Sequence, residues 1–139
     1  MLIETIDIKT IPTLEQGSLS FFEAERDVPF EIKRLYYTHD VPEGVQRGGH
    51  AHHELDQVLF CPYGCIEVVL DDGRTRESVM LDLPYTGLIV RSMIWHDMIW
   101  HASDSVLVVA ASDYYRESDY IRNYEEFVGL CLRSDHEEL

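Results

Sequence analysis

Short apolar runs recur along most of this chain, and polar turn residues separate one run from the next. This pattern is typical of an all-β sandwich or barrel, because each run is long enough for one strand and too short for a packed helix. Asp72-Gly73 marks one hairpin between them, since Asp-Gly tolerates the positive φ angles of a tight turn. Eight or so strands are expected, among them Ile32–Tyr37, Gln57–Phe60, Cys65–Leu70, Arg74–Leu81, Gly87–Val90, Ile94–Ile99 and Ser105–Ala111.

Only the C-terminal part of the chain has a helical pattern. Ile121, Tyr124, Phe127, Val128 and Cys131 recur at the spacing of one helix face, which predicts a short terminal helix. Strands and helix together predict a jelly roll that forms one domain over residues 1–139, since no linker interrupts the chain. A barrel of this size fills its narrow end with side chains and keeps a ligand pocket in its mouth.

The charge of the chain narrows the class of partner. It has 11 basic and 26 acidic residues and a formal net charge of −15, which repels nucleic acids and anionic lipids. We therefore expect neither a nucleic-acid partner nor a membrane partner. Three cysteines, an odd count, argue against a disulfide framework, and the acidic N-terminal residues do not resemble a signal peptide. Both features favour a cytoplasmic protein.

The segment 47–52, which reads Arg-Gly-Gly-His-Ala-His, is the clearest candidate site. Alternate side chains of a strand share a face, so His50 and His52 are expected to point to the same side. The preceding Gly-Gly pair lets another group approach the backbone closely. Two imidazoles on one face form a pocket wall that can move protons near neutral pH. A pair of structural histidines is the other interpretation of the same pattern.

This region resembles the first motif of the cupin superfamily, in which a His-x-His pair is followed by a Glu, then six residues and a Gly. Gln57 stands at the Glu position and Gly64 at the Gly position, and His96 is what remains of the second cupin motif. In metal-binding cupins the Glu is a ligand, and a neutral amide is a much poorer partner for a divalent cation. We expect no bound metal. A metal-dependent cupin enzyme that uses His50, His52 and His96 is the alternative.

A closer resemblance covers nearly the whole chain. Several segments, in order, are similar to those of the sugar 3,4-ketoisomerases, small cupins that act on dTDP-4-keto-6-deoxyglucose. The resemblance implies a homodimer without metal or cofactor, on a route to 3-amino-3,6-dideoxy sugars of cell-surface glycans. The segments are Ile32–Tyr37, residues 47–52, Asp56–Leu59, Leu70–Gly73, Trp95–Met98, Ala111–Tyr115 and Asp119–Arg122.

The same resemblance implies the reaction and its residues. Moving a carbonyl from C4 to C3 requires the proton at C3 to leave, an enediol or enediolate to form, and C4 to be protonated. His50 is expected as the base at C3 and His52 as its partner in proton return, with the reverse order left open. Arg47 and Tyr37 are the expected donors to developing oxygen charge, and Arg34 is the expected diphosphate contact. The expected substrate-binding residues are Arg34, Tyr36, Tyr37, Arg47, Gln57 and His96.

One departure from the family concerns the N-terminal segment. The family commonly has Arg-Gly-x-Leu there, whereas Gln16 precedes Gly17 in this chain. A charged substrate contact is missing at that position, which leaves the configuration of the product at C4 open. A non-catalytic module that binds a sugar nucleotide is a second alternative, because one fold hosts many functions.

Overall fold

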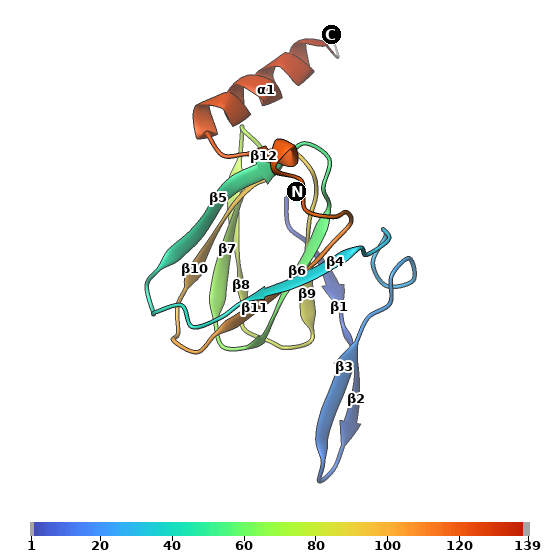
Figure 1. The fold of residues 1–139 in the computed structure, drawn as a ribbon. Helices are drawn as coiled ribbons and strands as arrows, with labels where there is room; N and C mark the ends of the chain where they lie inside the picture. The colour runs from blue at the N-terminus through green and yellow to red at the C-terminus, as the bar shows by residue number, and fades with distance from the viewer. Residues whose placement is uncertain (1, 138–139) are drawn as a thin grey trace.

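Two antiparallel five-stranded sheets face each other in the computed structural model, which describes residues 2–137 (Figure 1). This arrangement confirms the predicted cupin-type jelly roll with a C-terminal helix. In order across the sheet, the first sheet contains β1 (Glu4–Asp7), β9 (Thr86–Val90), β6 (Gln57–Tyr63), β11 (Val106–Ala111) and β4 (Arg34–Thr38). The second contains β12 (Tyr120–Ile121), β5 (Gln46–His52), β10 (Trp95–Trp100), β7 (Ile66–Asp71) and β8 (Arg76–Leu81).

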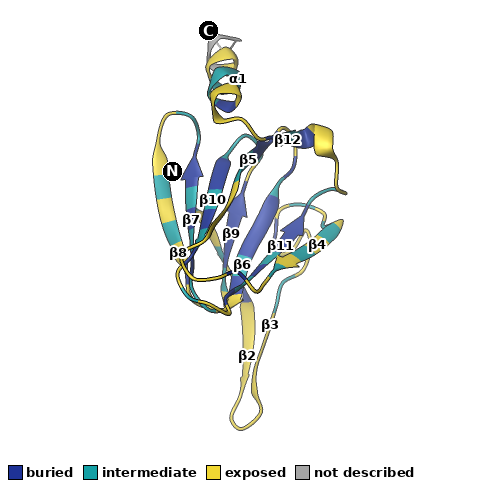
Figure 2. Ribbon diagram, turned by 60° about the vertical axis from the view of Figure 1, so that its left-hand side comes forward, coloured by how far each residue is buried: buried dark blue, intermediate teal, exposed yellow. Residues whose placement is uncertain are grey.

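The main hydrophobic core lies between the two sheets. Alternation along the strands sends one set of side chains inward, such as Val68 and Leu70 of β7, and these are fully buried (Figure 2). Each buried leucine contributes about 2 kcal/mol through the apolar area it removes from water. Trp100 is also fully buried, and its indole N–H donates to the carbonyl oxygen of Ser105 at 3.0 Å. These side chains form a packed core between the two sheets.

Helix α1 (Tyr124–Glu137) covers one end of the sandwich (Figure 1). Its Phe127 is buried against Trp95 of β10, with ring centroids 5.7 Å apart. The Tyr124 hydroxyl donates to Asp71 at the end of β7 at 2.6 Å, which fixes the start of the helix on the sheet. No helix within residues 2–137 is both long and apolar enough to span a bilayer.

The predicted helical pattern is wrong at its first position. Ile121 lies in β12, where it pairs with Ala51 of β5, and the helix starts only at Tyr124. The side-chain oxygen of Asn123 accepts a hydrogen bond from the backbone N–H of Glu126, so Asn123 caps the helix and sets its start. Ile121 fits the helical spacing because it is buried beside Phe127, although it reaches that cluster from a strand.

A hairpin of two strands, β2 (Lys9–Thr13) and β3 (Gly17–Phe21), projects away from the two sheets (Figure 1). All five residues of β2 are exposed, and the hairpin is coloured mostly as exposed in Figure 2. The pattern of apolar runs does not predict this hairpin, because its few apolar residues are spread among threonines and serines. Gln16 lies in the turn at its tip.

Candidate active site

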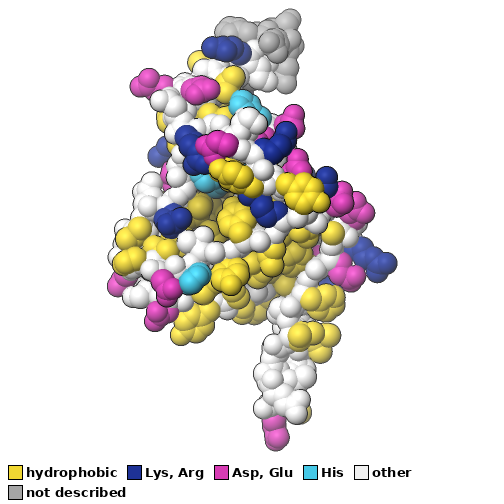
Figure 3. Space-filling model, viewed as in Figure 1, with side chains coloured by type: hydrophobic (Ala, Val, Ile, Leu, Met, Phe, Trp, Pro, Cys, Tyr) yellow, Lys and Arg dark blue, Asp and Glu magenta, His cyan; other side chains and the backbone are white. Residues whose placement is uncertain are grey.

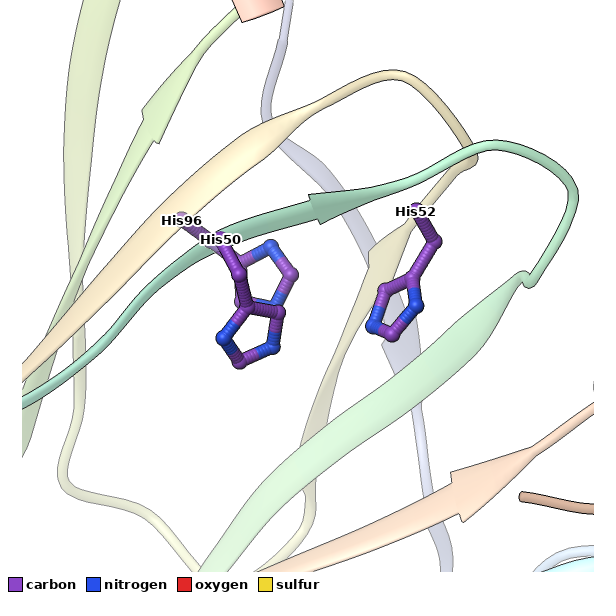
Figure 4. A group of neighbouring side chains, drawn as sticks. All are labelled: His50, His52 and His96. Atoms are coloured by element: carbon purple, nitrogen blue, oxygen red, sulfur yellow. The ribbon is translucent and has the colours of Figure 1, made fainter. Parts of the chain in front are cut away.

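Three histidines meet on the inner side of the second sheet, two from β5 and one from β10 (Figure 4). His50 and His96 are paired across the two strands, and their ring centroids are 4.6 Å apart. The ring centroid of His52 is 5.1 Å from that of His50 and 6.0 Å from that of His96. One nitrogen from each ring lies within 4.8 Å of the others. The predicted same-face pair is thus part of a three-histidine cluster.

Gly48 lets β5 lie close enough to β10 to form this cluster. Its φ angle is +92°, which L side chains rarely adopt, and a Cβ atom there would lie 2.9 Å from the carbonyl oxygen of His96. The pairing of the two strands shifts register between His96 and Asp97, next to this glycine. The Gly-Gly pair therefore brings the backbone of one histidine strand against that of the other.

Two histidines of the cluster each use one ring nitrogen to hold the ring in place. Nδ1 of His52 lies 3.1 Å from Oδ2 of Asp119, and Nδ1 of His96 donates to the carbonyl oxygen of Ile94 at 3.1 Å. Carboxylates and carbonyls accept hydrogen bonds, so the anchored nitrogen carries the hydrogen and the other keeps a lone pair. His52 and His96 therefore each present one hydrogen-bond acceptor to their surroundings.

The pKa of each of the three imidazoles is lowered. Burial, together with smaller contributions from the neighbouring His96 and His52, lowers the pKa of His50 to about 3. Burial also lowers the pKa of His52 to about 4, and His96 adds to this effect while Asp119 opposes it. The pKa of His96 is lowered by its burial. The cluster is neutral near pH 7, which leaves its free nitrogens able to accept protons.

A cavity of about 240 Å³ opens beside the cluster, and of its three histidines only His50 lines it. Three arginines line the same cavity, and no Asp or Glu does so within the described part of the chain. This concentration of positive charge contrasts with the net charge of −15 of the whole chain. The face seen in Figure 3 carries Lys and Arg side chains among apolar ones. The lining residues are Arg34, Tyr36, Thr38, Arg47, Gly48, His50, Met98, Leu107, Tyr120 and Arg122.

Strand β4 supplies a second wall of the cavity. The Arg34 guanidinium lies 5.2 Å from the ring centroid of Tyr36 and 5.6 Å from that of Tyr115. The Tyr36 hydroxyl donates to Oε1 of Gln57 at 3.0 Å. Burial raises the pKa of Tyr36 to about 12, so this hydroxyl stays protonated at any working pH. The arginine and the tyrosine are thereby held by neighbours before any ligand arrives.

The structure brings most of the predicted substrate-binding residues together. Arg34, Tyr36 and Arg47 line the cavity, while Gln57 and His96 are buried behind its walls. Tyr37 does not join them. It is 63% exposed on the opposite side of β4, because neighbouring residues of a strand point to opposite faces.

Three residues that sequence reasoning did not single out belong to the site: Asp119, Tyr120 and Arg122. The ring of Tyr120 lies 5.1 Å from that of His50 and 4.4 Å from that of His52. The Arg122 guanidinium stacks on Tyr120 at 4.3 Å. These residues reach the cluster because Tyr120 of β12 pairs with His52. No spacing rule joins residues so far apart, although Asp119–Arg122 is one of the segments that carry the family resemblance.

The side chains of this chain do not fit the metal set of the cupin fold. That set needs a carboxylate where this chain has Gln57. Oε1 of Gln57 already accepts a hydrogen bond from the Tyr36 hydroxyl. Nε2 of Gln57 is buried and has no hydrogen-bond partner among the described residues. This nitrogen carries hydrogens and donates, so it cannot serve as a metal ligand. The three imidazoles therefore lack the acidic ligand that completes this metal set.

Comparisons with known proteins by sequence and by structure point to the same family. Residues 1–131 match the FdtA family model, described as WxcM-like, C-terminal. The chain is 47% identical over 112 residues to the TDP-4-oxo-6-deoxy-alpha-D-glucose-3,4-oxoisomerase of Aneurinibacillus thermoaerophilus, covering 81% of each protein. A crystal structure of a 3,4-ketoisomerase from Helicobacter canadensis superposes with a TM-score of 0.90 at 39% identity, covering 94% of this chain and 98% of that one.

A further solved structure carries a ligand. It is a His-to-Asn variant of the 3,4-ketoisomerase QdtA from Thermoanaerobacterium thermosaccharolyticum in complex with TDP-4-keto-6-deoxyglucose. This chain is 34% identical to it, with a TM-score of 0.90 and coverage of 95% of both chains. Sequence and fold therefore agree with each other over nearly the full length.

Proposed function

The chain belongs to the WxcM-like, C-terminal family, whose members in these comparisons are sugar 3,4-ketoisomerases, and from this we propose that it converts TDP-4-keto-6-deoxyglucose into its 3-keto isomer. The observation that carries the proposal is a neutral histidine cluster beside a cavity lined by arginines. The histidines supply groups that accept and return protons, and the arginines supply the charge that a diphosphate needs. The chain is an isomerase, because the reaction only relocates a carbonyl.

The reaction moves two protons. One leaves C3 and one is added at C4, while the hydroxyl hydrogen leaves O3 and a new one forms on O4. The intermediate is an enediol or enediolate, in which both oxygens carry more negative charge than in the substrate. The enzyme therefore needs a base near the carbons, a second group near the oxygens, and hydrogen-bond donors for the developing charge.

His50 is the base at C3 in this proposal, and His52 is its partner. His50 is the one histidine of the cluster that lines the cavity, so its ring is the one that the sugar meets first. His52 lies one layer deeper, 2% exposed, and its Nε2 has no hydrogen-bond partner within residues 2–137. The C3 hydroxyl of the substrate and the C4 hydroxyl of the product are the donors that this nitrogen lacks.

The arginines divide between the oxygens and the diphosphate. Arg47 lies close to His50 along β5, which suits a donor to the developing oxygen charge. Arg34 and Arg122 line the same cavity from β4 and from the segment after β12, and a guanidinium matches two phosphate oxygens at once. Tyr36, rather than Tyr37, is the tyrosine that faces the sugar. Its hydrogen is donated to Gln57, so it offers oxygen lone pairs to a sugar hydroxyl.

Reduction with borodeuteride tests the proposed reaction. The purified, chelator-treated protein is incubated with TDP-4-keto-6-deoxyglucose, the mixture is reduced, and mass spectrometry locates the deuterium in the sugar. Deuterium at C3 is the expected result, because hydride adds at the carbonyl carbon. Deuterium at C4 alone, together with measurable binding of the sugar nucleotide, contradicts the isomerase and favours a binding module.

We also propose that the protein is a homodimer in which a second copy covers the β2–β3 hairpin. Ile11 is 50% exposed and Leu19 61% exposed, although both are apolar residues in paired strands. A two-stranded hairpin is at best marginally stable in water unless another surface covers one of its faces. A second molecule of the same chain supplies that surface by symmetry, as in most small soluble oligomers.

A further inference from the structure

Asp119 is held on both of its carboxylate oxygens. It lies at the end of a short 3-10 turn (Glu117–Asp119) and is only 7% exposed. Oδ2 lies 3.1 Å from Nδ1 of His52, and Oδ1 accepts the backbone N–H of Glu54 at 2.9 Å. The backbone carbonyl of Asp119 also accepts the N–H of His53 at 2.9 Å. The carboxylate is therefore fixed to the segment that follows β5, and its orientation toward His52 is set by the fold.

This contact determines which nitrogen of His52 carries the hydrogen. A carboxylate accepts, so Nδ1 must donate, and Nε2 is left with its lone pair. Nε2 is buried and has no hydrogen-bond partner among residues 2–137. The ring of His52 lies 5.1 Å from that of His50 and 4.4 Å from that of Tyr120, which lines the cavity. The unsatisfied acceptor thus lies beside two residues that line the cavity.

We propose that Asp119 is a positioning residue that keeps His52 in the Nδ1–H tautomer, so that the Nε2 lone pair can carry the oxygen-bound proton from O3 to O4. The proposal rests on the isomerase function proposed above. As the O3–H bond breaks, an N–H bond forms at Nε2, and the imidazolium is paired with the Asp119 carboxylate. As the O4–H bond forms, Nε2 gives up the same proton. No oxidant or other reactant is needed, since each proton that leaves the sugar returns to it.

Asp119→Asn separates this role from a structural one. The Asn carbonyl oxygen can still accept the N–H of Glu54, so the turn stays attached to the segment after β5. Its amide NH₂ group then faces Nδ1 of His52 and donates to it, which turns Nδ1 into an acceptor and moves the hydrogen to Nε2. The lone pair needed by the sugar is lost while the packing is kept.

The experiment combines a spectroscopic and a kinetic measurement. Nitrogen-15 NMR of labelled histidine rings gives the tautomer, with His52→Gln used to assign the signals. We expect Nδ1–H in the wild type and Nε2–H in Asp119→Asn. Loss of correctly placed general acid–base catalysis predicts a fall in kcat of about 10²- to 10⁴-fold, with TDP affinity and melting temperature unchanged. Asp113→Asn, which alters a half-buried carboxylate paired with Lys33 and Arg116, should leave all four readouts unchanged.

An Nε2–H tautomer in the wild type overturns the proposal, whether or not the variant folds. So does an Asp119→Asn protein that keeps its kcat, or one whose loss of activity is matched by lost TDP affinity and a lower melting temperature. A wild type that shows the Nδ1–H tautomer but no isomerase activity overturns the proposed function instead, and the two failures are thereby distinguished.

Discussion

The histidine cluster and the β2–β3 hairpin are both built from antiparallel strands. The cluster buries polar side chains, whereas the hairpin exposes apolar ones. Within the cluster, His52 and His96 are each 2% exposed. In the hairpin, Ile11 and Leu19 are at least half exposed. Both buried imidazoles are tolerated because protein groups bind one nitrogen of each ring. Exposed apolar strands are tolerated only when something else covers them.

In both regions the chain supplies the internal contacts by itself, and one partner group must come from another molecule. In the cluster, Nε2 of His52 lacks a donor within residues 2–137, which the substrate brings in the proposed reaction. The hairpin has its internal hydrogen bonds and lacks a partner surface, which a second copy brings in the proposed dimer. If this is correct, changes in the cluster should affect turnover without affecting assembly, and changes in the hairpin should affect assembly first.

The largest effect is expected from His50→Asn. Removing the base at C3 should lower kcat by about 10²- to 10⁴-fold, because a positioned base contributes that much to proton transfer. TDP affinity and the molar mass in solution should not change. His101→Asn is the control, since His101 bonds to Glu67 on the surface. Steady-state kinetics and TDP titration check the result, and an unchanged kcat would remove His50 from the mechanism.

The double variant Ile11→Asp with Leu19→Asp should convert the dimer to a monomer. Placing two charges where the proposed interface would bury two apolar side chains costs about 4 kcal/mol, or roughly 1,000-fold in the dissociation constant. Light scattering after size exclusion measures the mass. Met80→Asp alters an exposed apolar residue of β8 and should leave the mass unchanged. A wild type that is monomeric at all concentrations contradicts the proposed partner.

The cavity arginines should control affinity for the nucleotide. Arg34→Gln removes charged hydrogen bonds to the diphosphate and should weaken TDP binding by about 10- to 100-fold. Arg91→Gln is the matched control, because Arg91 pairs with Glu4 at 2.9 Å and does not line the cavity. Calorimetric titration with TDP distinguishes the two. Equal losses in both variants would mean that overall charge, rather than this cavity, attracts the nucleotide.

The smallest effect concerns stability against acid. Burial lowers the pKa of His52 from 6.5 to about 4. Below pH 6.5 this histidine therefore becomes protonated in the unfolded chain, while in the folded chain it stays neutral until the pH nears 4. Stability therefore falls as the pH falls. Between pH 6.5 and pH 5 this histidine should account for about 2 kcal/mol of the loss. Urea unfolding at the two pH values measures it, and His52→Gln should show a shallower dependence; an equal dependence in both proteins excludes His52 as the cause.

Local patterns in the sequence predicted much of the fold and part of the site. Alternation and turn residues identify most strands of the two sheets, and the His-x-His spacing places His50 and His52 on one face. The hairpin could not be predicted in this way, because its strands are not stabilised by burial against the two sheets. Asp119 could not be predicted from spacing either. It reaches His52 only because β12 pairs with β5, a contact between residues distant in the chain.

Tyr36 and Tyr37 illustrate the remaining limit. Family resemblance and position drew attention to both, and neighbouring residues in a strand must face opposite sides. Which of the two faces inward depends on the register of β4 against β11, where Tyr36 pairs with Val109 and Tyr37 with Val108. Register is a property of the assembled sheet, so the sequence alone indicates both tyrosines as candidates. The structure shows that Tyr36 is the one that lines the cavity.

Proton NMR of TDP-4-keto-6-deoxyglucose with the chelator-treated protein in D₂O tests the central claim most directly. We predict that the C3 proton signal disappears and that a 3-keto product forms that carries hydrogen or deuterium newly bonded at C4. That result requires both proton transfer and relocation of the carbonyl, which binding alone does not produce. An unchanged spectrum, with TDP shown to bind, would contradict the isomerase.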